Sequence, residues 1–416
     1  MRALVFTFGT RGDVQPYVAL GAALSAQGHT VTLCTGQGFD DLIVSHGLES
    51  APVSIDYREV LATQEAQAAL RSVSGKLKAM RAFKGLIRRQ VEEMWQIADA
   101  VHPDFIVYHP KGMAAPYIAE ARGIIAIPTL LQPMVATAAF PSPLLPFRDL
   151  GRTGNRLTHQ FLGWVTAKVQ TSLMGKRSTP LPVFDGYDPQ SREVPRLHGY
   201  SEQLVAKPKD WTAREHITGY WSLPATRNYT PPAPLARFLE AGSPPVYVGF
   251  GSMPATDAQA QTRIVVDALH RSGQRGLLAT GWGGLESIAD NSIYVIESAP
   301  HDWLFPRCAV VVHHGGAGTT HEGLRWGRPT IVCPLGVDQP FWGRRVMEIG
   351  AGPEPIAQKH LDSGSLAAAL DAVKSPAIVA RACDIEAAMR EEGGAAEAAE
   401  AIGSFLDQRR TLRVRA

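Results

Sequence analysis

The chain has 416 residues, of which 45% are hydrophobic and 19% are charged. This composition is typical of a folded globular protein and excludes a large disordered share. Lys and Arg number 41 against 39 Asp and Glu, so no overall field attracts the chain to nucleic acid. The length predicts two domains, because a single hydrophobic core stops growing at about 250–300 residues.

Short β-rich runs alternate with helix-length segments in both halves of the chain. In the first half we expect strands at 3–8, 30–35, 105–108 and 124–131, and a helix at 14–27. In the second half we expect strands at 246–250, 276–280, 293–296, 309–313 and 330–333, and helices over 257–271 and from 318. This alternation is typical of parallel α/β units. The predicted fold is therefore α/β, with two doubly wound parallel sheets in tandem.

A Pro-rich stretch near the middle of the chain separates these halves. Its composition predicts an extended linker. We expect an N-terminal domain at 1–222, the linker at 223–235, a C-terminal domain at 236–376 and terminal helices with a frayed basic end at 377–416.

The N-terminus and the cysteines indicate the cellular compartment. Met1 leads directly into an apolar run without the charged region and cleavage site of a signal peptide, so a cytoplasmic protein is expected. No stretch approaches the roughly 20 apolar residues that cross a bilayer, so any membrane contact would be peripheral. The cysteines at 34, 308, 333 and 383 lack ligand spacing and are interpreted as reduced core residues.

The most informative stretch is a glycine-rich turn at 313–324 that joins a buried strand to a helix. Glycines let a ligand approach the backbone, and the first amides of a helix attract anions. The stretch contains neither GK[ST] nor GxGxxG, so a Walker loop and a dinucleotide fingerprint are unsupported. A tight turn without a ligand is the alternative. His314 is interpreted as functional, whereas His313 is either structural or functional.

This stretch and a second one resemble a known family. The segments 314–323 (HGGAGTTHEG) and 334–343 (PLGVDQPFWG) are similar to the nucleotide-sugar signature of the UDP-glycosyltransferase superfamily, which has the GT-B fold. The segments 7–16, 216–221, 249–253 and 299–304 resemble its sterol and glycopeptide branch. The resemblance implies two Rossmann-like domains facing across a cleft, a UDP-sugar donor and no cofactor.

The resemblance assigns most of the donor site. It implies that the diphosphate contacts His314 and the amides of Gly316, Ala317, Gly318 and Thr319, and that Ser252 adds a hydroxyl. Asp338 and Gln339 would hold the sugar hydroxyls, and the Ala299 backbone would contact the base. For Asp338 and Gln339, the alternative is a helix N-cap before Pro340, and the two roles are compatible.

Two residues bear on the donor nucleotide. A carboxylate at Glu322 can accept hydrogen bonds from both hydroxyls of a ribose, whereas a deoxyribose offers only one, so Glu322 favours UDP over dTDP. The alternative is a glutamate at a helix start, stabilised by the helix dipole. Trp282 either stacks on uracil or anchors its glycine-rich loop.

The resemblance also implies the catalytic residue. Asp13 lies where the family has its base, and it would take the proton of the acceptor hydroxyl as UDP leaves. The alternative is an N-cap for a helix that begins at Val14. Thr10, Arg11 and Gly12 would complete a polar loop facing the donor phosphates. A single displacement predicts inversion, and without a DxD or His/carboxylate cluster the reaction is expected to be metal-independent.

The acceptor side is expected in 57–101 and 131–171, where apolar, Pro-rich stretches suit a lipophilic hydroxyl acceptor such as a sterol, polyketide or aromatic natural product. The segment 71–91 has the pattern of a basic amphipathic helix, which either touches an anionic membrane or packs on its own domain. The predicted function is transfer of a hexose, glucose from UDP-glucose. The alternatives are a UDP-sugar 2-epimerase-type isomerase of the same fold and a non-catalytic nucleotide-sugar-binding protein.

Overall fold

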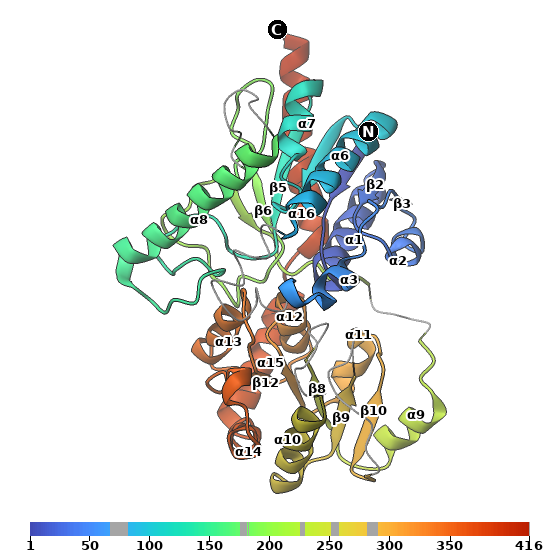
Figure 1. Cartoon of the computed structure of the whole chain (residues 1–416), viewed down its shortest axis with the longest axis vertical. Helices are drawn as coiled ribbons and strands as arrows, with labels where there is room; N and C mark the ends of the chain where they lie inside the picture. Colours follow the sequence, from blue (N-terminus) through green and yellow to red (C-terminus); the bar gives the residue numbers. More distant parts are fainter. Residues whose placement is uncertain are drawn as a thin grey trace. The chain divides into compact units, whose positions relative to one another are not determined.

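The computed structural model describes residues 1–66, 82–174, 181, 183–224, 229–250, 258–280 and 290–415, with the side chains of 258 and 410–415 left out. The chain divides into two compact units (Figure 1). Unit 1 comprises Met1–Leu223 and Glu392–Ala416, and unit 2 comprises Pro224–Glu391.

Unit 1 is built on a parallel sheet that has seven strands within the described residues, in the order β3-β2-β1-β4-β5-β6-β7. Its strands are β1 (Arg2–Phe6), β2 (Thr30–Cys34), β3 (Glu49–Ser50), β4 (Phe105–Tyr108), β5 (Ile125–Leu130), β6 (Arg196–His198) and β7 (Glu215–Ile217). Its helices are α1 (Arg11–Ala26), α2 (Asp40–Val44), α3 (Tyr57–Ala62), α6 (Lys84–Val101), α7 (Ala115–Arg122), α8 (Gly151–Met174) and α16 (Gly394–Arg415). Helices cover both faces of this sheet, so the side chains of β1 and β4 are buried on both sides.

Unit 2 repeats the plan on a smaller scale, with five parallel strands among the described residues in the order β10-β9-β8-β11-β12. These strands are β8 (Val246–Gly249), β9 (Gly276–Ala279), β10 (Ile293–Ile296), β11 (Val310–His313) and β12 (Thr330–Val332). The helical elements are α9 (Ala233–Glu240), α10 (Ala258–Arg271), α11 (His301–Leu304), η1 (Phe305–Arg307), α12 (Ala317–Arg325), α13 (Gln339–Glu348), η2 (Gln358–His360), α14 (Ser363–Ala372) and α15 (Pro376–Arg390).

The predicted alternation of strands and helices is confirmed in both units, and β4 and β10 run over the predicted residues. The sequence reasoning missed β6 and β7, which extend the first sheet on one side. Both strands have three residues and include charged side chains, so neither produces an apolar run. Their Arg196 and Glu215 form an ion pair of 2.8 Å between Nη1 and Oε1, which satisfies the buried carboxylate.

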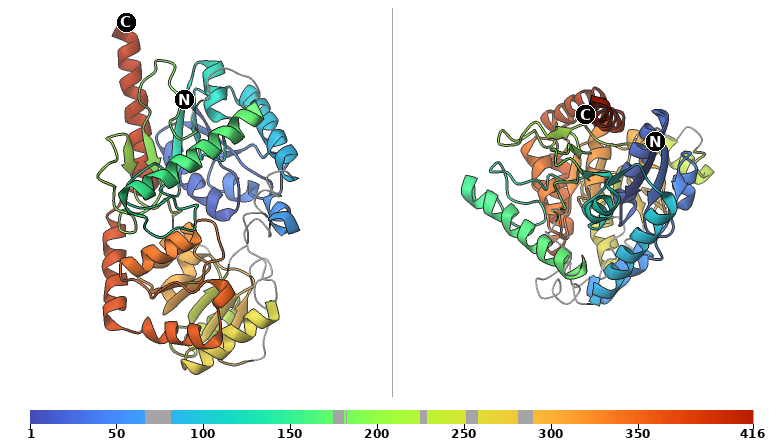
Figure 2. Two further views of the ribbon diagram at one scale, coloured as in Figure 1. Left: turned by 60° about the vertical axis from the view of Figure 1, so that its left-hand side comes forward. Right: turned by 90° about the horizontal axis from the view of Figure 1, so that it is seen from above.

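The C-terminal helices are divided between the units, α15 in unit 2 and α16 in unit 1 (Figure 2). Ala398, Ala399 and Ile402 of α16 belong to the core that also contains α1. The expectation of a frayed basic end from Arg409 is wrong at that residue, because Arg409 is buried and its Nη2 lies 2.6 Å from Asp188 Oδ1. The buried face of α16, which includes Ile402 and Leu406, therefore continues to Arg409.

Two further expectations were tested by burial. Cys34, Cys308 and Cys333 are buried free thiols as expected. Cys383 is exposed, because α15 buries Ala382, Ile385 and Met389 on another face.

In the segment 71–91, residues up to 81 lie outside the described part. The described remainder belongs largely to α6, which buries Gln90, Val91, Met94 and Ala98. Of the described helices, none is long and apolar enough to cross a bilayer.

Candidate catalytic and donor sites

Asp13 and Lys111 meet at the point where the strand order of the first sheet reverses. The chain moves from β1 outward to β2 and β3, and then returns to β4 on the other side of β1. Ligands bind α/β sheets beyond the carboxyl ends of the strands at such a switch point. Asp13 follows β1 and Lys111 follows β4, so the topology brings together two residues that are 98 positions apart.

The Asp13 carboxylate is held by three donors. Its Oδ1 accepts from Lys111 Nζ at 2.6 Å, and its Oδ2 accepts from the Thr10 amide at 2.9 Å and from the Thr10 hydroxyl at 3.4 Å. The Asp13 side chain is 14% exposed and that of Lys111 is 48% exposed. Each carboxylate oxygen has two lone pairs, so the group can still accept a proton from a ligand.

Gly9 makes room for this ion pair. Its φ of +137° lies in a region that favours glycine. A Cβ there would lie 2.1 Å from Asp13 Oδ2 and 2.9 Å from Lys111 Nζ. The glycine before the helix is therefore part of the site, and a larger residue would displace the carboxylate.

The charges around Asp13 keep it ionised. Burial by itself raises the pKa of the carboxyl, but the attraction of Lys111 and His109 and the hydrogen bonds from Lys111 and Thr10 outweigh it, so the pKa is lowered. His109 is buried, and its Nδ1 accepts from the Lys111 amide at 3.1 Å. Burial, with a smaller effect of Lys111, lowers the pKa of His109 to about 4. The sequence reasoning missed Lys111 and His109, whose only signal was their position after an apolar strand.

The structure places Arg11 and Gly12 in helix α1 and not in a loop, and it contradicts the alternative in which Asp13 is an N-cap. Helix α1 begins at Arg11, with Thr10 as N-cap and Asp13 as the third residue of the first turn. Thr10 and Asp13 form a reciprocal capping box, which starts the helix three residues earlier than Val14. Arg11 is exposed, and its Nε donates to Gln15 Oε1 at 2.9 Å.

The corresponding reversal in unit 2 lies between β8 and β11, where His313 pairs with Gly249. His313 is buried, and its Nδ1 accepts from the Gly315 amide at 2.9 Å, so it braces the glycine turn. His314 follows at the end of the strand, and within the described part of the chain its buried Nδ1 has no hydrogen-bond partner. Burial lowers the pKa of His314 to about 4, so the imidazole is neutral at physiological pH.

The imidazole of His314 lies over the start of α12. A Cβ at Gly316, the N-cap residue, would lie 2.7 Å from His314 Nε2, so a larger residue there would displace the ring. Gly316 has no side chain to cap the first-turn amides of Ala317, Gly318 and Thr319. The next amide, that of Thr320, donates within the helix to Gly316 O at 3.0 Å. A neutral histidine beside a nine-residue helix N-terminus can bind a diphosphate.

Glu322 is buried inside α12, in the second turn, not at its start as the dipole interpretation required. Its Oε1 accepts from Trp326 Nε1 at 2.8 Å and from Arg325 Nη1 at 3.1 Å. Burial raises the pKa of Glu322, and Arg325 and Trp326 offset part of this rise. The structure thus gives Glu322 a role within its own helix, and the bonds found among the described residues involve Oε1.

Asp338 and Gln339 lie at the start of α13, beside the glycine turn. Asp338 is the N-cap residue but makes no side-chain cap, and its Oδ2 accepts instead from Trp342 Nε1 at 3.0 Å. Gln339 is buried, and its Oε1 accepts from the Leu335 amide at 2.8 Å. Val337, just before them, has a φ of +59°, which is a strained conformation for a β-branched residue and is typical of functional loops.

Of the remaining expected donor residues, Ala299 lies within the described part of the chain. Ala299 is half-buried just before α11 and packs on the cluster of Leu304 and Phe305. Ser252 and Trp282 lie outside the described residues. Among the residues that the structure describes, no three His, Cys, Asp or Glu side chains gather into a group that could hold a metal ion.

Comparisons with known proteins define the class of protein. The model of the glycosyltransferase family 28 N-terminal domain matches residues 3–141, and that of the erythromycin biosynthesis protein CIII-like C-terminal domain matches residues 279–404. Among solved structures, the calicheamicin glycosyltransferase CalG4 has a TM-score of 0.71 at 16% identity, covering 98% of both chains. The glycosyltransferase SsfS6 of Streptomyces sp. SF2575, complexed with thymidine diphosphate, has a TM-score of 0.63 at 19% identity, covering 97% of this chain and 99% of SsfS6. The fold is GT-B, the architecture of a large class of glycosyltransferases.

Two plant proteins define the family. Sterol 3-beta-glucosyltransferase UGT80A2 of Arabidopsis thaliana is 34% identical over 98% of this chain and 66% of its own length. Sterol 3-beta-glucosyltransferase UGT80B1 of the same plant is 31% identical over 98% of this chain and 68% of its own length. The chain therefore belongs to the UDP-glycosyltransferase superfamily, in the branch of these sterol enzymes. It spans about two thirds of the length of these plant relatives and about 30% of a fungal one from Aspergillus fumigatus.

Proposed function

We propose that this protein is an inverting glycosyltransferase that transfers glucose from UDP-glucose to the hydroxyl of a lipophilic acceptor, a sterol in the first instance. The observation that carries the proposal is the Asp13 carboxylate at the switch point of unit 1. The ion pair with Lys111 keeps it ionised, and the Thr10 amide holds it in position. The relationship to sterol glucosyltransferases over 98% of the chain supports the acceptor class. Unit 1, within 1–222, would bind the acceptor, and 236–376 would bind the donor.

Asp13 is the general base in this reaction. It takes the proton of the acceptor hydroxyl while the oxygen attacks the anomeric carbon, and the bond from that carbon to the diphosphate oxygen breaks. A positioned base typically contributes about 10²–10⁴ in rate. One displacement inverts the anomeric configuration, so an α-linked donor yields a β-glucoside.

The charge of the leaving diphosphate is stabilised in unit 2 by His314 and the first-turn amides of α12. Because His314 is neutral, it contributes an N–H donor, while the helix N-terminus supplies about half a positive charge. We propose that Ser252 adds a hydroxyl, that Asp338 and Gln339 contact the sugar, and that the Ala299 backbone and Trp282 contact the base. With these donors in place the reaction proceeds without a metal ion.

Mass spectrometry of the products tests this proposal. The purified protein is incubated with UDP-glucose and a 3β-hydroxysterol in detergent micelles, with EDTA present. We expect a sterol hexoside whose anomeric proton has the coupling of a β-linkage. A UDP-sugar epimer without glycoside would indicate the isomerase instead, and activity lost to EDTA and restored only by a divalent ion would refute the metal-free mechanism.

We also propose that the protein is cytoplasmic and contacts membranes only at their surface, where a sterol is available. The segment 71–91 contains seven basic residues and no acidic residue, which favours contact with an anionic membrane. In its described part, α6 packs on unit 1 through Val91 and Met94 and exposes Arg88 and Arg89. Substituting both arginines by Gln and measuring binding to anionic vesicles tests this contribution, and unchanged binding would refute it.

A further inference from the structure

Helix α8 exposes three large apolar side chains and buries four polar ones, Asn155, Thr158, His159 and Gln170. Leu157, Phe161 and Trp164 recur at i, i+4 and i+7, so they share one face of the helix. Their exposed fractions are 57%, 55% and 59%. A surface helix normally shows the opposite arrangement, with its apolar stripe toward the core. We call these three residues and Lys168, which follows on the same side, the α8 face.

The inward polar side chains hold α8 in this orientation. Thr158 Oγ1 accepts from the Ser142 amide at 2.8 Å, and His159 Nε2 lies 3.1 Å from Phe140 O. Gln170 Nε2 donates to Met113 O at 3.1 Å. Because these bonds would break if the helix rotated about its axis, exposure of the aromatic face is a fixed feature of the unit.

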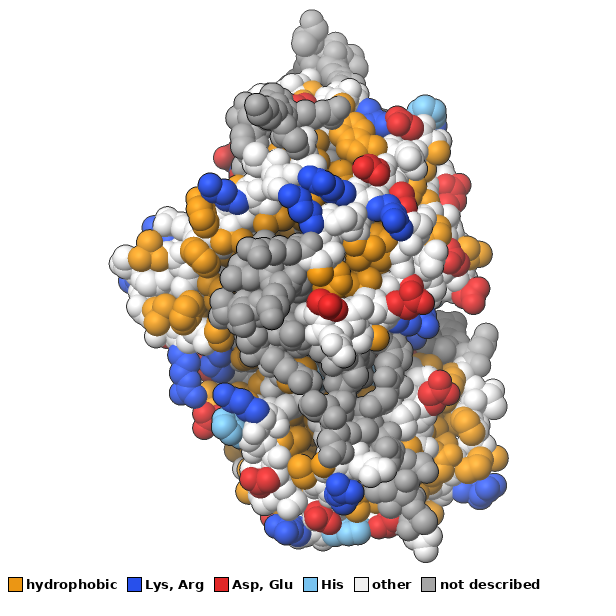
Figure 3. All heavy atoms as spheres, viewed as in Figure 1, with side chains coloured by type: hydrophobic (Ala, Val, Ile, Leu, Met, Phe, Trp, Pro, Cys, Tyr) orange, Lys and Arg blue, Asp and Glu red, His pale blue; other side chains and the backbone are white. Residues whose placement is uncertain are grey.

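The exposed apolar surface is concentrated around this helix. Of the large hydrophobic side chains found exposed in the described residues, Phe147 and Leu150 immediately precede α8 and three more form the α8 face. Figure 3 shows hydrophobic side chains gathered over α8, with Lys and Arg side chains beside them. Contiguous apolar surface of this kind marks an interaction site.

The charges around the face are predominantly positive. Helix α8 carries Arg152, Arg156 and Lys168 and contains no Asp or Glu. Lys168 Nζ lies 5.2 Å from the centre of the Trp164 ring. The neighbouring acids are Asp149, which accepts from Asn155, and Asp210, which pairs with Arg156. Two of the three cations of the helix therefore face solvent without a salt bridge among the described residues.

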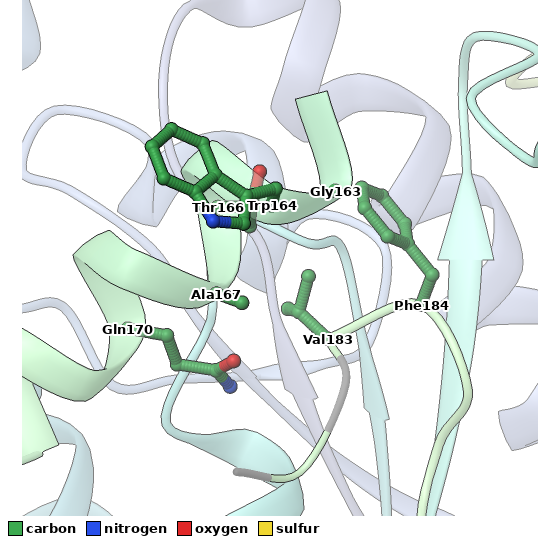
Figure 4. A pocket seen from close by; sticks show the side chains of 7 residues that line it. All are labelled: Gly163, Trp164, Thr166, Ala167, Gln170, Val183 and Phe184. Carbon is green, nitrogen blue, oxygen red and sulfur yellow. The ribbon is translucent and has the colours of Figure 1, made fainter. Parts of the chain in front are cut away.

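The apolar surface also continues beneath the helix. A cavity of about 370 Å³ is lined by Trp164, Ala167 and Gln170 of α8 and by Val183 and Phe184. Figure 4 shows Trp164 and Phe184 on two sides of this hollow, with Val183 between them. The volume is within the range of small-molecule sites. Trp164 thus belongs both to the outer face and to the cavity wall.

We propose that the α8 face docks the protein onto the surface of an anionic lipid bilayer. Leu, Phe and Trp enter the boundary between headgroups and acyl chains, where aromatic rings are favoured, and the flanking Arg and Lys side chains contact anionic headgroups. This surface is distinct from the segment 71–91, and the proposal does not depend on the identity of the transferred sugar.

Vesicle flotation tests the proposal with the full chain. The vesicles contain phosphatidylcholine alone or with about 30% phosphatidylserine. The double variant Phe161→Ser and Trp164→Ser removes the aromatic part of the face. Val44→Ser is the matched control, because Val44 is 61% exposed and lies on α2 of the same unit. Arg152→Gln with Lys168→Gln removes charge only.

We expect the wild type and Val44→Ser to bind phosphatidylserine vesicles and the aromatic variant to bind about tenfold or more weakly. The charge variant should lose most of the difference between the two vesicle types and most of the salt dependence. UDP affinity, measured by calorimetry, should be unchanged in all variants, which separates docking from the donor site. Equal vesicle binding by the aromatic variant, no binding by the wild type, or a dimer that this variant dissociates in sedimentation would overturn the proposal.

Discussion

The switch points of the two sheets have the same topology but different electrostatics. In unit 1, the loops after β1 and β4 bring a carboxylate and an ammonium group together, Asp13 and Lys111. In unit 2, the turns after β11 and β12 bring together a neutral histidine and the N-termini of α12 and α13. Parallel α/β topology thus supplies the location, and the side chains after each strand determine the chemistry.

Asp13 and Glu322, one acid from each unit, also differ in their pKa shifts. Lys111 and Thr10 keep the pKa of Asp13 low despite its burial, so the carboxylate is ready to accept a proton. Burial raises the pKa of Glu322, although Arg325 and Trp326 oppose the rise. Glu322 is therefore an internal anchor as much as a ligand group, whereas the Asp13 side chain is the more exposed of the two, at 14% against 7%.

Asp13→Asn should have the largest effect. It removes the base but keeps the size and part of the capping ability of the side chain, so we expect turnover to fall by about 10²–10⁴ with UDP affinity nearly unchanged. Steady-state kinetics and calorimetry measure the two quantities. Asp41→Asn, at the exposed first turn of α2, is the control. Full turnover in the Asp13 variant would remove this residue from the mechanism.

Glu322 tests whether an anchored acid also reads the ribose. If it does, Glu322→Ala should lower the preference for UDP-glucose over dTDP-glucose by about 1.5–3 kcal/mol, or roughly 10- to 150-fold in the ratio of kcat/KM. Loss of the bonds to Arg325 and Trp326 should also lower the melting temperature. Glu322→Gln retains an acceptor for Trp326 and serves as the control for stability. A lowered melting temperature with an unchanged donor ratio would leave Glu322 as an anchor alone.

His314→Ala should weaken the donor by about tenfold, because one N–H donor to the diphosphate is lost in both the ground state and the transition state. Calorimetry with UDP-glucose measures this, with His360→Ala of the exposed η2 turn as control. Since the pKa of His314 is about 4, its charge does not change between pH 5.5 and 8. We therefore expect the contribution of His314 to be constant over this range, and a contribution that grows below pH 7 would indicate a charged imidazole.

Lys111→Met should have the smallest effect at neutral pH and a distinct effect in acid. Without the ammonium group, the effect of burial dominates and the pKa of Asp13 rises, because the attraction of a neighbouring opposite charge is lost. Because the base must be ionised, the acidic limb of the kcat/KM profile should move to higher pH. Lys84→Met, exposed at the start of α6, is the control. An unmoved limb would show that Lys111 does not set the state of Asp13.

Stability should follow the same sign. A carboxyl whose pKa is lower in the fold than in the unfolded chain stabilises the fold above its unfolded value of about 3.9, and this contribution is lost as the pH falls through the folded value. The melting temperature of Lys111→Met should therefore match the wild type more closely in acid than at neutral pH.

The local patterns of the sequence predicted most of the strands and the helices α1, α10 and α12, because buried parallel strands produce short apolar runs between glycines. The runs at 105–108 and 293–296 coincide with β4 and β10. The glycine turn before α12 was also predicted, because a glycine-rich stretch follows a buried apolar strand. The start of α1 at Arg11 was not predicted. Asp13 suits an N-cap before Val14 equally well in the sequence, whereas in the structure it forms a capping box with Thr10.

Contacts between residues far apart in the chain were decided by the tertiary structure alone. Lys111 carries no local signal of its role, and it reaches Asp13 only because β4 returns beside β1. Arg409 is ordered because Asp188, 221 positions away, meets it in the buried interior. The outward apolar face of α8 likewise depends on bonds from Thr158, His159 and Gln170 to other segments. Sequence periodicity identifies the apolar side of a helix, but the packing of distant segments determines which side is buried.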